Sequence, residues 1–262
     1  MKVVKGQYSE AIIFTDDVED IAMEQIKNLC DQSFVEGAKI RIMPDTHAGK
    51  SCVIGFTADL KDKVIPNIVG VDIGCGMLTI FLGKEDFHLE KLDEVIKKYV
   101  PSGKNVHEGR MIRYEKLQEL YCYRSLKNSK RLENRCYTYM CKRLERSIGT
   151  LGGGNHFIEV DKDKDNNKYL VIHSGSRNLG TQVAEYYQNL AVDLCSGKED
   201  YYIRRDEIID TFKKAGRRKE IQKELKKLKA EYEEKFPSYP KELCFLTGKY
   251  RDEYLHDMNI CQ

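Results

Sequence analysis

The stretch that most constrains the fold is Leu151-Gly152-Gly153-Gly154-Asn155-His156-Phe157-Ile158-Glu159, together with Val171-Ile172-His173-Ser174-Gly175-Ser176-Arg177. Residues 157–160 and 168–173 carry the apolar and β-branched side chains typical of strands, and the charged run 161–167 predicts a turn between them. The strands of such a hairpin are antiparallel, so the residue before the first strand and the last residue of the second lie at the same end. These residues are His156 and His173. The hairpin therefore predicts two neighbouring imidazoles, which are candidate metal ligands.

A second glycine-flanked stretch, Gly70-Val71-Asp72-Ile73-Gly74-Cys75-Gly76, adds a carboxylate and a thiol. A hard carboxylate and a soft thiolate so close in sequence can share one divalent ion or bridge two. Asp72, Cys75, His156 and His173 form a mixed donor set, and its softness favours zinc or another late first-row metal. For this stretch alone, a buried cysteine after a core strand, with Asp72 capping a turn, is the competing interpretation.

An anion site is predicted where the second strand meets the next helix. Ser174-Gly175-Ser176-Arg177-Asn178 precedes a helix that begins near Leu179. Free N–H groups and the positive end of the helix attract an anion there, and the planar guanidinium of Arg177 suits a phosphate. An ordinary capped turn with a surface arginine is the alternative. The adjacency of Arg177 to His173 favours a phosphate held beside the metal.

Composition limits the class of protein. The chain has 262 residues, 41% of them hydrophobic, which is enough for one large domain or two small ones. No apolar run is long enough to cross a bilayer, and the N-terminus lacks an apolar signal core, so we expect a cytoplasmic protein. The formal net charge is +2, so any contact with RNA or DNA must come from a local patch. The nine cysteines are expected to be reduced and buried, with Cys75 as the exception.

Hydrophobic patterning predicts a mixed α/β fold. Besides the hairpin, strands are expected over residues 8–14, 39–43, 52–58, 68–72 and 77–82. Helices are expected over residues 18–34, 89–100, 111–148 and 179–194, and the charged segment at about 204–236 predicts a helical hairpin. Near the end of the chain, one helical face is expected to carry Tyr254, Leu255, Met258 and Cys261.

Four motifs together resemble the RNA-splicing ligases of the RtcB family. They are Met43-Pro44-Asp45-x-His47, Gly70-Val71-Asp72-Ile73-Gly74-Cys75-Gly76, Gly149-Thr150-Leu151-Gly152-Gly153-Gly154-Asn155-His156-Phe157-Ile158-Glu159, and His173-Ser174-Gly175-Ser176-Arg177. They occur in the family's order, and residues 252–258 also resemble a family helix. The resemblance implies a single ligase domain over residues 1–262, with an RtcB-like fold and a helical insertion at about 204–236.

This resemblance implies GTP- and manganese-dependent joining of RNA ends. One end carries a 2′,3′-cyclic phosphate or a 3′-phosphate, and the other carries a 5′-hydroxyl. A histidine is first guanylylated, the guanylyl group passes to the RNA 3′-phosphate, and the 5′-hydroxyl then attacks and releases GMP. Such chemistry fits two metal ions that neutralise charge on both sides of an in-line displacement.

The resemblance also assigns roles to particular residues. Asp72 and His156 would bind one manganese, Cys75 would bridge two, and His173 would bind the second. The remaining assignments are Asn155 and Glu159 to the guanine nucleotide, Arg177 to the RNA 3′-phosphate, and Asp45 to orienting the guanylylated histidine.

One departure from the family affects the expected activity. Family members carry a third histidine ligand and the nucleophilic histidine beyond the point where this sequence ends, and neither has a counterpart here. We therefore expect a chain truncated at its C-terminus, inactive alone, that works with a separate C-terminal chain. Two alternatives stay open: a non-catalytic module that binds metal and RNA, and a zinc-dependent phosphoesterase in which Glu159 is the general base.

Overall fold

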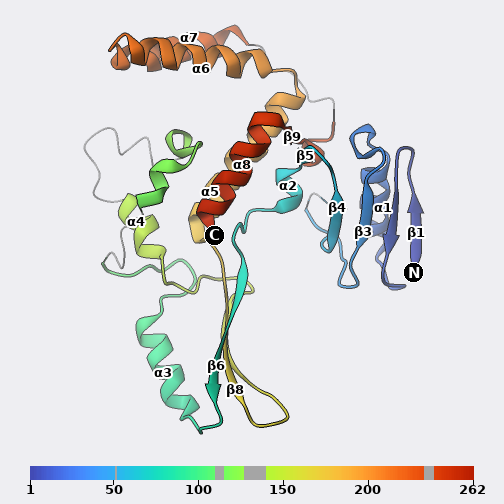
Figure 1. Ribbon diagram of the computed structural model, residues 1–262, viewed down its shortest axis with the longest axis vertical. Coiled ribbons are helices and arrows are strands. Elements are labelled where there is room, and N and C mark those ends of the chain that lie inside the picture. The colour runs from blue at the N-terminus through green and yellow to red at the C-terminus, as the bar shows by residue number, and fades with distance from the viewer. Residues whose placement is uncertain (51, 110–114, 127–139, 233–238) are drawn as a thin grey trace. The chain divides into compact units, whose positions relative to one another are not determined.

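The computed structural model describes residues 1–50, 52–109, 115–126, 140–232 and 239–262 (Figure 1). These residues form two compact units. The first unit comprises Met1–Val69 and Tyr187–Arg251, and the second comprises Gly70–Tyr186 and Asp252–Gln262. Helices and strands occur in both, which confirms the predicted mixed α/β class. The assignment of residues 1–262 to one ligase domain stays a prediction.

The first unit is built on a four-stranded sheet in the order β1-β2-β3-β4. Its strands are β1 (Lys2–Lys5), β2 (Glu10–Ile13), β3 (Lys39–Ile42) and β4 (Phe56–Asp59). The β1–β2 and β3–β4 pairs are antiparallel, whereas β2 and β3 are parallel. Parallel neighbours require a crossover connection, and α1 (Asp20–Cys30) supplies it.

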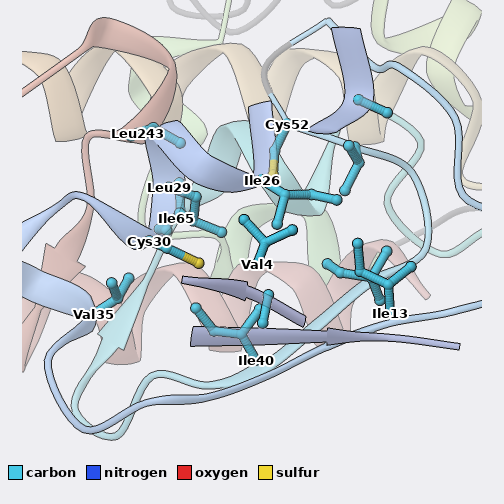
Figure 2. Packing of buried hydrophobic residues seen from close by; sticks show 14 of the residues in the cluster. Val4, Ile13, Ile26, Leu29, Cys30, Val35, Ile40, Cys52, Ile65 and Leu243 are labelled. Carbon is cyan, nitrogen blue, oxygen red and sulfur yellow. The ribbon is translucent and has the colours of Figure 1, made fainter. Parts of the chain in front are cut away.

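The hydrophobic core of the first unit lies where α1 covers this sheet. Ile13 of β2 and Ile40 of β3 are completely buried, as are Ile26 and Leu29 of α1. Figure 2 shows these four side chains within the cluster. Full burial of a side chain of this size stabilises the fold by about 1.5–3 kcal/mol. The strands were predicted for this reason, because buried residues alternate with exposed ones along β3.

Short elements and a helical hairpin complete the first unit. They are η1 (Ser33–Val35), β5 (Lys63–Val64), α2 (Pro66–Val69), α6 (Glu199–Lys214), η5 (Arg218–Glu220), α7 (Ile221–Glu231), η6 (Lys241–Leu243) and β9 (Leu246–Thr247). The α6–α7 pair is the expected charged hairpin (Figure 1). It begins earlier than expected, at Glu199, because Glu199 and Asp200 place negative charge at the positive end of the helix.

The second unit contains an antiparallel three-stranded sheet in the order β6-β8-β7. Its strands are β6 (Gly76–Gly83), β7 (Phe157–Lys162) and β8 (Lys168–Ser174). Its helical elements are α3 (Leu89–Tyr99), η2 (Glu115–Glu119), η3 (Tyr123–Ser125) and α4 (Met140–Ser147). Two helices, α5 (Arg177–Cys195) and α8 (Gly248–Cys261), have residues in both units. Across the described residues, no helix has the length and apolar character to cross a membrane.

The strand expected over residues 68–72 is wrong. Residues 66–69 form the short helix α2 instead, and a loop follows. Pro66 is the first residue of this helix, where its fixed φ and missing N–H are tolerated. Gly70 then has a φ of 89°, a left-handed conformation that ends helices.

The long helix expected over residues 111–148 is also wrong where the structure describes it. Residues 110–114 and 127–139 lie outside the described part, and only α4 is α-helical. Between them the backbone N–H groups of Tyr121 and Cys122 donate to the Asp257 carboxylate, at 2.9 and 3.0 Å, rather than to a helix. Asp257 is completely buried in α8, whereas Leu255, expected on the buried face, is 44% exposed.

Candidate metal centre

Three metal-ligating side chains meet at one end of the second unit's sheet. Cys75 precedes β6, His156 precedes β7, and His173 lies near the end of β8. One donor atom from each lies within 4.8 Å of the others. Cys75 Sγ lies 2.8 Å from His173 Nε2, and the centroids of the two imidazole rings are 5.3 Å apart. This spacing lets one divalent cation bind sulfur and nitrogen donors together.

Strand register explains why these residues meet. Phe157 pairs with His173, and Gly76 pairs with Ser174. The residue before each of the two pairing strands, His156 or Cys75, is therefore at the same end of the sheet as His173. The predicted proximity of the two histidines is confirmed.

Asp72 is the fourth predicted ligand, and it lies beside His156. Its Oδ2 is 3.1 Å from His156 Nε2. The other ring nitrogen, Nδ1, lies 3.0 Å from the Leu151 carbonyl oxygen. A proton on Nδ1 that is donated to this carbonyl leaves a lone pair on Nε2, facing the carboxylate. A divalent cation beside these two atoms would relieve the repulsion between them, so the donor set fits a metal.

A tight turn brings Asp72 and Cys75 together. The Cys75 N–H donates to the Asp72 carbonyl oxygen at 3.2 Å, and Gly74 adopts a φ of 78° within the turn. Partial removal from water and the neighbouring Asp72 carboxylate raise the pKa of the Cys75 thiol. A bound divalent cation reverses this balance, because its charge stabilises the thiolate.

Arg177 lies against the same histidine at the start of α5. Its Nη1 is 3.0 Å from His156 Nδ1, and its Nη2 donates to the Gly103 carbonyl oxygen at 3.4 Å. Arg177 has a φ of 59°, a costly conformation for a residue with a side chain. The guanidinium packs so closely on Gly152 that a Cβ there would collide with it. The glycine-rich loop therefore makes room for Arg177.

A cavity of about 550 Å³ opens beside Asp72, His156 and Arg177. Its other lining residues are Val71, Gly103, Lys104, Asn105, Val106, Arg143, Ser147, Thr150, Gly153, Asn178, Thr181, Gln182 and Glu185. Lys104, Arg143 and Arg177 give part of this lining a positive charge, which suits a phosphorylated ligand. The local basic patch that the sequence left undetermined thus includes these side chains.

Sequence reasoning missed Lys104, Arg143 and Gln182. The first two lie in polar segments that offer no pattern. Gln182 had a detectable signal, because it is a polar residue within the buried face of α5 formed by Leu179, Val183 and Tyr187.

The three remaining predicted site residues stay predictions. Asn155 and Glu159 are exposed, and Glu159 lies on the same face of β7 as Phe157, the strand partner of His173. Asp45 belongs to the first unit, on the loop after β3, where its carbonyl oxygen lies 2.9 Å from His47 Nδ1. The reduced state expected of most cysteines fits the seven described ones, which are free thiols, while Cys136 and Cys141 lie outside the described residues or side chains.

Comparison with known proteins gives a consistent result. The family model described as tRNA-splicing ligase RtcB matches residues 25–262. The chain is 34% identical over 193 residues to the RNA-splicing ligase RtcB of Escherichia coli (strain K12), covering 66% of this chain and 45% of that protein. It is 32% identical over 211 residues to the tRNA-splicing ligase RtcB of Archaeoglobus fulgidus, covering 63% of this chain and 43% of that protein. The chain thus spans about half the length of these relatives, and it belongs to the RtcB family.

Proposed function

We propose that this chain is part of an RNA ligase that joins a 2′,3′-cyclic phosphate or 3′-phosphate end to a 5′-hydroxyl end, using GTP and manganese. The observation that carries the proposal is the meeting of Cys75, His156 and His173 within 4.8 Å, with Arg177 in contact with His156. Metal ligands beside a guanidinium suit the binding and activation of a phosphate. The names of the similar proteins support RNA as the substrate, through tRNA splicing or RNA repair.

The metal ligands in this proposal are Asp72, Cys75, His156 and His173. Bound divalent ions would supply charge neutralisation at the reacting phosphate. His156 is held for this role by the Leu151 carbonyl, which fixes the proton on Nδ1 and directs Nε2 to the metal. The thiol and imidazole donors suit zinc better than manganese, so manganese rests on the resemblance to the family.

The other residues bind and orient the substrates in this proposal. Arg177 holds the RNA 3′-phosphate, because its guanidinium is presented by the Gly152 loop beside the metal ligands. Asn155 and Glu159 contact the guanine nucleotide. Asp45 orients the guanylylated histidine.

The guanylylated histidine is proposed to lie outside these 262 residues. In this proposal a separate chain, or more of the same chain, supplies it, and the 262 residues alone do not ligate. The exposure of Met77, Leu78 and Phe81 on β6, at 59%, 55% and 62%, supports a partner segment at this strand.

Incubation with GTP labelled at the α-phosphate, in the presence of Mn²⁺, tests the proposal. We expect no covalent GMP adduct on the 262-residue chain. Mixed with the remaining segment of a family member, it should form the adduct and join a 3′-phosphate RNA to a 5′-hydroxyl RNA. Cys75→Ala should abolish joining, whereas Cys195→Ala, which changes a thiol in the first unit, should not.

Three outcomes would contradict parts of this proposal. An adduct on the 262-residue chain alone would show that the nucleophile lies within it. A completed, metal-loaded protein that joins no RNA would exclude the ligase. Purified protein that contains zinc and releases inorganic phosphate from a 3′-phosphate RNA would favour a phosphoesterase, the reaction class that the soft donor set also allows.

A further inference from the structure

The cavity beside the metal centre contains a buried hydrogen-bond acceptor without a partner. Gln182 is only 7% exposed and lines this cavity. Its Nε2 donates to Asn178 Oδ1 at 2.6 Å, but within the described part of the chain its Oε1 has no hydrogen-bond partner. A buried acceptor left unpaired destabilises a protein, so such groups usually have a ligand or water to bind.

A buried donor in the same cavity is also unpaired. Arg177 Nε has no hydrogen-bond partner among the described residues. Arg177 and Gln182 lie five positions apart on α5, about 7.5 Å along the helix axis at 1.5 Å per residue. The cavity therefore presents a donor that suits a phosphate and, about one and a half helical turns away, an acceptor that suits a hydroxyl or N–H group.

The hydrogen bond to Asn178 restricts what Gln182 can recognise. A glutamine that reads adenine uses both its carbonyl and its amino group. Here Asn178 occupies the amino group, so Gln182 offers the cavity only its carbonyl oxygen. An acceptor alone suits a hydroxyl group, which every ribonucleotide carries whatever its base.

We propose that Gln182 accepts a hydrogen bond from the 2′-hydroxyl of the nucleotide whose 3′-phosphate binds Arg177. The 2′-hydroxyl and the 3′-phosphate are on neighbouring carbons of one ribose, so one RNA end can satisfy both unpaired groups. Gln182 is then a specificity-determining residue that distinguishes an RNA end from a DNA end. This inference rests on the proposed function, because it needs the 3′-phosphate at Arg177.

Fluorescence anisotropy with the 262-residue chain tests this inference. Three labelled oligonucleotides of one sequence differ only at the last nucleotide: ribose with 3′-phosphate, deoxyribose with 3′-phosphate, and ribose with 3′-hydroxyl. We expect the ribose 3′-phosphate end to bind about two- to tenfold tighter than the deoxyribose one, which is the effect of one neutral hydrogen bond. Gln182→Met should remove this ratio, mainly by weakening the ribose end.

Control variants separate this effect from loss of folding. Gln188→Met makes the same change on α5 at a residue that does not line the cavity, and it should keep the ratio. Gln182→Glu retains an acceptor oxygen and should also keep it, even if Gln182→Met unfolds. Arg177→Ala should weaken both phosphorylated ends equally.

Two different failures can be distinguished. Wild-type protein that prefers 3′-phosphate over 3′-hydroxyl, but binds ribose and deoxyribose ends equally, overturns the role of Gln182 and leaves the proposed function intact. An unchanged ratio in folded Gln182→Met has the same meaning. Protein that binds all three ends alike shows no phosphate site, which overturns the inference together with its basis in the proposed function.

Discussion

The two sheets of this protein differ in how much of their surface is buried. In the first unit, Ile13 and Ile40 are completely buried beneath α1. In the second unit, the consecutive residues Met77 and Leu78 of β6 are 59% and 55% exposed. Consecutive strand residues point to opposite faces, so β6 is open on both. Hydrophobic burial stabilises the first sheet, whereas β6 depends on its pairing with β8.

This difference separates stability from chemistry. The hydrophobic cluster in Figure 2 lies entirely in the first unit, whereas the predicted metal ligands all lie in the second. Cys75 and His173 owe their proximity to strand register and to a glycine-containing turn. We therefore expect substitutions in the first sheet to change folding, and substitutions at the end of the second to change ligand binding.

The largest expected effect is on the core of the first unit. Ile26→Ala removes a completely buried side chain from α1 and should cost about 2–5 kcal/mol of unfolding free energy. Leu78→Ala on β6 should cost no more than about 0.5 kcal/mol, because the side chain is already exposed. Urea denaturation followed by circular dichroism measures both. Equal costs would break the comparison between the two sheets.

Metal binding should stabilise the second unit. A divalent ion at a hundredfold excess over its dissociation constant should add about 2.7 kcal/mol, and a chelator should remove this gain. Thermal unfolding with and without Zn²⁺ or Mn²⁺ measures it. Cys75→Ala should abolish the gain, because it removes the sulfur donor. Cys30→Ala, in the core of the first unit, should lower stability yet leave the metal-dependent gain unchanged.

A buried carboxylate in the second unit should matter more than an exposed one. Asp257→Asn replaces an acceptor oxygen with an NH₂ group opposite the N–H groups of Tyr121 or Cys122. A buried donor without an acceptor should cost about 1–3 kcal/mol. Asp93→Asn is the control, because Asp93 forms an exposed i,i+4 pair with Lys97 worth about 0.3–0.5 kcal/mol. A small effect of Asp257→Asn in urea denaturation would show that α8 does not organise residues 121–122.

The sequence predicted those features that follow from local patterns. Alternating side chains predicted the hairpin, and antiparallel pairing then placed His156 beside His173. Features set by distant contacts were missed. The apolar residues around Ile68 suggested a strand, but the backbone preferences of Pro66 and Gly70 formed a short helix there. Gln182 resembled an ordinary helical residue until the structure showed its burial.

Cysteine reactivity gives the smallest expected effect, and it reverses the order that exposure alone would suggest. A hydrogen bond from the Cys244 thiol lowers the pKa of Cys195 to about 7, although burial opposes this. Burial raises the pKa of Cys30 and of Cys52 to about 11. Partial desolvation and Asp72 raise that of Cys75 in the absence of metal. The thiolate is the nucleophile, so the group with the lowest pKa reacts first.

After chelator treatment, iodoacetamide near pH 8 should therefore modify Cys195 before Cys75, even though Cys75 is the more exposed thiol. Near this pH, Cys195 is above its pKa and mostly ionised, whereas the other three thiols remain largely protonated. Peptide mass spectrometry over time measures the order. Cys244→Ala removes the donor, so it should raise the pKa of Cys195 and slow its modification at neutral pH. Faster modification of Cys75 in the wild-type protein would show that exposure, not ionisation, controls reactivity, and that the thiol of the second unit is the more reactive one.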